Sequence, residues 1–115
     1  MAPITHIVLF QYKADMSATE VKARPQKVND EFFTLKRRCV HPTTRIPYIV
    51  SLKGGVDNSP EGLQGGITHA FVVEFASAED RDYYVTMDPA HLGFVKGLGD
   101  LLEKAQVIDF TPGTF

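Results

Sequence analysis

Residues 67–76 have the sequence ITHAFVVEFA, which predicts a β-strand because β-branched and aromatic side chains dominate it. Alternate side chains of a strand point to opposite faces of the sheet. One row of this strand therefore holds Ile67, His69, Phe71, Val73 and Phe75. The other row holds Thr68, Ala70, Val72 and Glu74. We expect the bulkier row to face helices, while the second row keeps an apolar centre between polar ends.

Similar apolar patterns on both sides of this strand predict further strands at residues 3–12, 48–54 and 105–110. A capping box formed by Ser17 and Glu20 predicts the start of a helix. This helix is expected to run to about residue 39 and to be either kinked or restarted at Pro25.

A second helical region is predicted to begin after Ser77 and to be interrupted at Asp88 and Pro89. It should resume over residues 89–104, with an inward face formed by Phe94, Leu98, Leu101 and Leu102.

Residues 54–66 are dense in Gly, Asn, Ser and Pro, which indicates a loop long enough to act as a lid or as part of an interface.

The predicted order of elements, βαββαβ, is typical of an α+β, ferredoxin-like sheet in a single domain over residues 1–115. Right-handed crossovers place both helical regions on one face of such a sheet. The opposite face would then expose Ile7, Leu9, Ala70 and Val72 to water. Exposed apolar patches usually mark interfaces. We therefore expect a homodimer, in which two sheets pack face to face as a dimeric α/β barrel.

Composition narrows the range of partners and cofactors. Twelve Lys and Arg residues against 14 Asp and Glu residues leave a net charge of −2, which argues against nucleic acid or an anionic membrane as a partner. The single cysteine, Cys39, excludes an internal disulfide, and no spacing typical of metal ligands occurs, so we expect no metal and no cofactor. Neither a signal peptide nor a membrane span is apparent, and a cytoplasmic location is expected.

Several motifs together resemble those of the stress-responsive dimeric A/B barrel (Dabb) family, and in particular of its fungal branch. They include T-H-I-V-L-F at 5–10, G-G-V-D-N-S-P-E-G-L at 54–63, D-P-A-H-L-G-F-V at 88–95 and V-I-D-F-T-P at 107–112. The resemblance spans essentially the whole chain in the right order. It implies a ferredoxin-like protomer that dimerises through its sheet, as the strand pattern also indicates.

Two histidines are candidate catalytic residues. The plant polyketide cyclase that makes olivetolic acid, a distant relative in this family, uses a histidine on its first strand and one in an H-P-A-H segment; these match His6 and His91. The proximity of His91 to a helix start should lower its pKa and favour a neutral general base. In this scheme His91 abstracts a proton alpha to a carbonyl, and His6 stabilises or protonates the oxyanion. The alternative is that both histidines are structural.

Aromatic residues could form the wall of a substrate cavity, although core packing explains the same pattern. The cyclase also uses two tyrosines. The one on its first helix has no counterpart near residues 27–28 of this chain. The other corresponds to a position near Val85, beside two tyrosines of which only one can face inward. The candidate substrate-binding residues are Phe10, Phe32, Phe71, Tyr83, Tyr84 and Phe94.

Two functions follow from these observations. The first is a cofactor-independent cyclase, lyase or isomerase acting on an apolar, oxygenated, polyketide-like molecule by histidine acid–base catalysis. The second is a non-catalytic, stress-responsive oligomeric protein. An enzyme needs a cavity of roughly 300 Å³ or more with polar groups converging on it, whereas an assembly protein can be packed solid.

Overall fold

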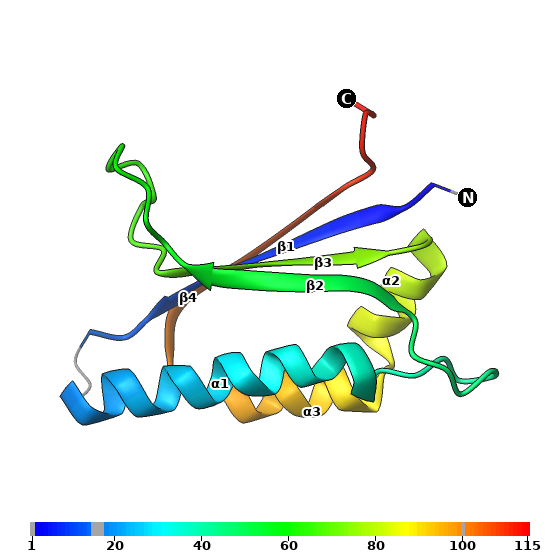
Figure 1. Cartoon of the computed structure of the whole chain (residues 1–115), viewed down its shortest axis with the longest axis horizontal. Helices are drawn as coiled ribbons and strands as arrows, with labels where there is room; N and C mark the ends of the chain where they lie inside the picture. The colour runs from blue at the N-terminus through cyan, green and yellow to red at the C-terminus, as the bar shows by residue number, and fades with distance from the viewer. Residues whose placement is uncertain (1, 15–17, 100) are drawn as a thin grey trace.

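A computed structural model of the chain describes residues 2–14, 18–99 and 101–115 and has the predicted ferredoxin-like fold (Figure 1). The described elements follow the order βαββαβ, with the second helical position divided between two helices. Their bounds are β1 Ile4–Tyr12, α1 Ala18–Arg38, β2 Ile49–Val56, β3 His69–Phe75, α2 Ala78–Thr86, α3 Pro89–Leu98 and β4 Leu102–Phe110.

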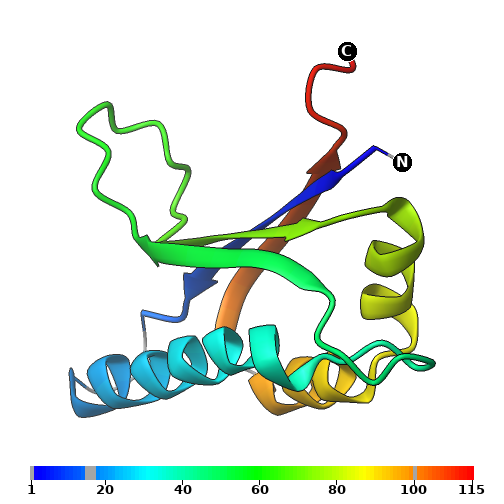
Figure 2. The same cartoon turned by 45° about the vertical axis from the view of Figure 1, so that its right-hand side comes forward.

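The strands form one antiparallel sheet in the order β2-β3-β1-β4, and the helices cover one of its faces (Figures 1 and 2). The connection between β2 and β3 projects from the opposite side of the sheet, as does the C-terminal segment, at the other end. No helix among the described residues is long and apolar enough to cross a membrane.

The alternation predicted for β1 is present along its whole length, where buried and half-buried residues alternate. The fully buried row, which includes Val8 and Phe10, packs with Phe32 and Leu35 of α1 in the hydrophobic core. The other row belongs to the uncovered face, which we call the open face. Its apolar residues are Ile7, Leu9, Ala70, Val72, Ile108 and Phe110.

The expectation of a helix over residues 89–104 is wrong beyond Leu98. Helix α3 ends at Leu98 and β4 begins at Leu102. Gly99, at the C-terminal cap of α3, has a φ of 54°, a conformation that glycine adopts readily and that ends the helical path. Leu101 and Leu102 therefore leave the helix, although Leu101 is still buried in the core.

The first helix is continuous through residue 25, so it does not restart at Pro25. The predicted capping box depends on Ser17, which lies outside the described residues. The two shorter helices have clear N-caps. Ser77 accepts a hydrogen bond from the backbone N–H of Asp80 at the start of α2, and Asp88 accepts one from Ala90 at the start of α3.

Candidate active site

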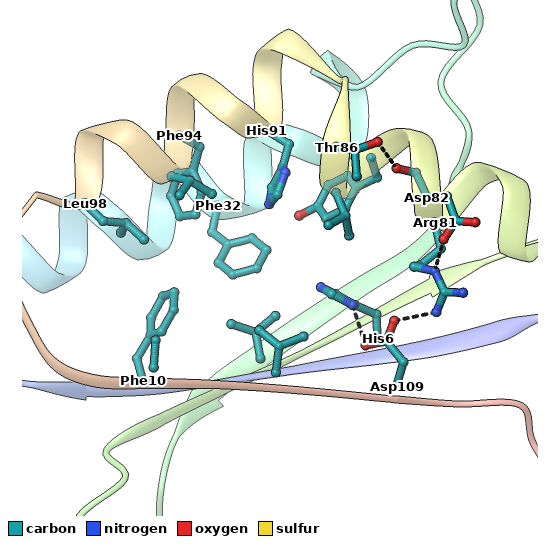
Figure 3. A pocket seen from close by; sticks show the side chains of 16 residues that line it. His6, Phe10, Phe32, Arg81, Asp82, Thr86, His91, Phe94, Leu98 and Asp109 are labelled. Carbon is teal, nitrogen blue, oxygen red and sulfur yellow. Dashed lines mark hydrogen bonds and ion pairs between the residues drawn. The ribbon is translucent and has the colours of Figure 1, made fainter.

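A cavity of about 520 Å³ lies between the helix-covered side of the sheet and the helices (Figure 3). Residues of β1 and β4 form one wall, residues of α2 and α3 form the other, and α1 contributes Phe32. Much of the lining is apolar, with Val8, Phe10, Phe32, Phe94, Leu98 and Val107. The volume exceeds the roughly 300 Å³ that a small-molecule site requires.

His6 is held at one end of the cavity by a carboxylate on the neighbouring strand. The side chain is 5% exposed, and its Nδ1 donates a hydrogen bond of 2.7 Å to Oδ1 of Asp109. The contact follows from the sheet register, because His6 and Asp109 are paired directly across β1 and β4. The other ring nitrogen points into the cavity (Figure 3).

The same carboxylate binds a cation. Nη1 of Arg81, on α2, donates a hydrogen bond of 2.8 Å to Oδ2 of Asp109, and Nε of Arg81 donates one of 2.7 Å to Asp82. Both oxygens of Asp109 are therefore occupied, one by His6 and one by Arg81.

Tyr84 connects the two candidate histidines. Its buried ring stacks on His91 with 3.9 Å between centroids, and it contacts His6 edge-on at 5.8 Å. The two imidazole rings thus lie within about 10 Å of each other, close enough for one substrate to contact both.

His91 has a chemical environment that suits a reacting group. Its Nδ1 is the one buried side-chain nitrogen or oxygen without a hydrogen-bond partner in the described part of the chain. Burial of the ring lowers the pKa of His91 below its ordinary value of 6.5. The lowered pKa agrees with the expectation from the sequence, although burial rather than the helix start is the chief cause. Burial also raises the pKa of Tyr84, which stays a neutral phenol.

The structure brings most of the predicted site residues to one place. Phe10, Phe32, Tyr84 and Phe94 line the cavity together with His6 and His91. Of the two tyrosines, Tyr84 is the one that faces inward.

Two of the predicted substrate-binding residues do not line the cavity. Phe71 is fully buried behind Phe32, on which it stacks with 4.3 Å between ring centroids. Tyr83, the residue before Tyr84 in α2, faces away from the cavity, and its ring centroid lies 5.7 Å from that of Tyr48.

Asp109 and Arg81 were not predicted as site residues. The sequence offers one signal for Asp109, a carboxylate flanked by apolar residues in the strand segment AQVIDF. Its partner depends on the register between β1 and β4, which connects residues 103 positions apart. Among the described residues, no group of three or more His, Cys, Asp or Glu side chains could hold a metal ion.

Comparison with known proteins gives a family and a set of structural neighbours. The sequence profile described as the Stress Responsive A/B Barrel Domain matches residues 4–112. Among curated protein sequences, none matches this chain significantly.

Three solved structures illustrate the neighbours. The hydroxynitrile lyase from Passiflora edulis is 25% identical with a TM-score of 0.78, and the match covers 99% of this chain and 97% of that one. A protein from Arabidopsis thaliana is 26% identical with a TM-score of 0.75, covering 97% of both chains. A dimeric protein of unknown function from Bacteroides fragilis is 22% identical with a TM-score of 0.63, covering 96% of this chain and 97% of that one, and shows the shared ferredoxin-like fold.

Proposed function

Because the chain belongs to the stress responsive A/B barrel domain family, we propose that it is a cofactor-independent enzyme that moves a proton on a small, largely apolar, oxygenated molecule. One observation carries this proposal: His6, His91 and Tyr84 lie together in a largely apolar cavity of about 520 Å³. A cavity that served packing alone would have no need of two imidazoles that converge on it.

In the proposed reaction His6 is the general base. The carboxylate of Asp109 accepts the Nδ1 hydrogen of His6, which leaves the lone pair on Nε2 toward the cavity. His6 takes a proton from the carbon alpha to a carbonyl, and Asp109 stabilises the imidazolium that forms. The sequence alone favours the reverse roles, because it does not reveal the contact with Asp109.

His91 is the proposed hydrogen-bond donor to the carbonyl oxygen. Its lowered pKa keeps the ring neutral at pH 7, and a neutral imidazole carries one N–H that can stabilise an enolate oxygen as charge develops on it. Stacking on Tyr84 holds the ring in place. Returning the proton to another carbon or to a leaving group would complete an isomerase, cyclase or lyase reaction.

The substrate would be uncharged over most of its length. Phe10, Phe32 and Phe94 would contact its apolar body, while its carbonyl lies between the two histidines. The likeness to a hydroxynitrile lyase at 25% identity supports a lyase among these reaction types. A polyketide-like aromatic ketone fits the same description.

The proposal is tested by exchange of alpha protons, which requires no knowledge of the natural substrate. Acetophenone is incubated with the protein in D₂O, and deuterium uptake in its methyl group is followed by NMR. Wild-type protein should accelerate the exchange, and His6→Ala and His91→Ala should each reduce the acceleration by about 100-fold or more.

His69→Gln provides the matched control, because His69 is a half-buried histidine that does not line the cavity. It should exchange at the wild-type rate. Equal rates in all four proteins would contradict the proposal and favour a non-catalytic, stress-responsive oligomer.

We further propose that two copies pair through the open face as a homodimer. The apolar residues of this face lie on β1, β3 and β4 with no helix over them, and the relative from Bacteroides fragilis is dimeric.

The expected cytoplasmic location agrees with Cys39, a fully buried free thiol.

A further inference from the structure

The exposed residues of the cavity lining gather along one edge of the sheet. The lining residues of β1 and α1 are buried, so the cavity is covered on those two sides. The exposed lining residues belong to the edge strand β4 and to the helices that face it, and they are Asp82, Val85, Thr86, Val95, Ala105 and Val107. The cavity therefore opens to solvent between β4 on one side and α2 and α3 on the other.

Two hydrogen bonds mark the ends of this opening, which we call the slot. At one end Nη1 of Arg81, on α2, donates a hydrogen bond of 2.8 Å to Asp109 of β4 and so bridges the gap (Figure 3). At the other end, where α3 gives way to β4, the backbone N–H of Leu101 donates one of 3.2 Å to the carbonyl oxygen of Leu98. Between Asp109 and Ala105 alone the strand advances by ~14 Å, since each strand residue spans ~3.4 Å. A flat or extended molecule could lie along the slot.

The two sides of the slot present apolar side chains to water. Val95, on α3, is 46% exposed, and Val107, on β4, is 58% exposed. Val107 is paired across the sheet with Val8 of the cavity lining, so its exposed surface continues directly into the cavity. Exposed apolar surface that continues into a cavity is typical of a place where an apolar ligand makes contact.

We propose that the slot is the entrance of the cavity, and that Val95 and Val107 set the width of the molecule that can pass through it. An uncharged, flat ligand would enter edge-on over β4. The inference rests on the proposed function for the identity of the substrate and adds its route and its size limit. Passage itself requires no reaction and can be measured by binding alone.

The test uses full-length protein and acedan, a naphthyl methyl ketone whose fluorescence depends on the polarity of its surroundings. Stopped-flow fluorescence gives its association and dissociation rate constants. Val95→Trp and Val107→Trp narrow the slot and should each lower both rate constants by about 10-fold or more, because entry and exit cross the same barrier. The dissociation constant, which is the ratio of the two, should change by less than about threefold.

Two smaller substitutions test the same idea in the opposite direction. Val95→Ala and Val107→Ala widen the slot and should each raise both rate constants by about threefold or more. These exposed positions tolerate alanine, so the two variants serve if a tryptophan variant does not fold or does not bind. Lys96→Trp is the matched control, because Lys96 is an exposed residue beside Val95 that does not line the cavity. It should bind acedan at wild-type rates.

Three results would overturn the inference: a wild type that does not bind acedan, association rates in the alanine variants equal to that of wild type, or a change confined to one of the two rate constants. The last result would make the valines part of the wall around the bound ligand and not its entrance. If acedan binds with these rate changes but acetophenone shows no accelerated exchange, the proposed function fails and the entrance stands.

Discussion

At the scale of single residues, the burial of His91 links the site to the stability of the fold. Because burial lowers the pKa of His91, the folded protein binds a proton on this ring less readily than the unfolded chain does. Below pH 6.5, the ordinary histidine value, the unfolded chain takes up the proton first. The free energy of unfolding therefore falls as the pH drops through the range below 6.5.

His91→Phe should reduce this acid sensitivity while keeping an aromatic ring against Tyr84. We expect a smaller difference between the free energies of unfolding at pH 7.5 and pH 5.0 than in the wild type, measured by urea denaturation. The pKa of His69 is also lowered by burial, but this contribution is present in both proteins and cancels in the comparison. An identical pH dependence would show that His91 accepts a proton as easily when folded.

Single residues also mark the limit of what the sequence reveals about the site. His6 could be assigned to the inward row of β1 from alternation alone, because strand periodicity is local. Its partner Asp109 could not, since the hydrogen bond depends on how two distant strands align. Likewise, choosing between Tyr83 and Tyr84 required the rotation of α2 against the sheet, which depends on tertiary packing.

At the scale of elements, β2 and β3 approach each other closely at one glycine. A Cβ atom on Gly54 would lie 2.5 Å from Cδ1 of Phe71 and 2.6 Å from the backbone oxygen of Ala70. Gly54→Ala should therefore destabilise the protein by about 1–3 kcal/mol, because the core and the strand backbone must both shift.

The neighbouring glycine provides a matched control for this prediction. A Cβ on Gly55 would meet no atom within 4 Å, and Gly55→Ala should change the free energy of unfolding by less than about 0.5 kcal/mol. Urea denaturation of both variants measures the contrast. Equal changes would mean that strand propensity, and not the contact with Phe71, determines the effect.

Elements also differ in how well the sequence predicts their ends. Helix α2 begins where Ser77 predicts it, because an N-cap is a local hydrogen bond. Helix α3 ends earlier than its apolar pattern suggests, since leucines at 101 and 102 fit a helical face as well as the entry to a strand. Here the backbone conformation of Gly99 outweighs the side-chain pattern.

At the scale of the whole molecule, the open face determines the expected assembly. Leu9→Asp would place a charge at the centre of the proposed interface and should raise the dissociation constant of the dimer by about 100-fold or more. Sedimentation equilibrium over a range of protein concentrations measures this change. The cost arises because burying an unpaired carboxylate outweighs the apolar contacts that remain.

Leu92→Asp is the corresponding control, because Leu92 is an exposed leucine of α3, on the helical side of the sheet. It should leave the dimer intact. A wild-type protein that sediments as a monomer at every concentration, or two variants that behave alike, would contradict assembly through the open face.

The alternation of side chains along β1 has a consequence for ligand saturation. His6, Val8 and Phe10 face the cavity, whereas Ile7 and Leu9 face the other way, toward the proposed partner. Each protomer thus contains a whole cavity, and the contacts between protomers use a separate set of side chains. The two ligands of a dimer would therefore bind without cooperativity, and the saturation curve would be hyperbolic. Residues in one row could be substituted over evolution without a change in the function of the other row.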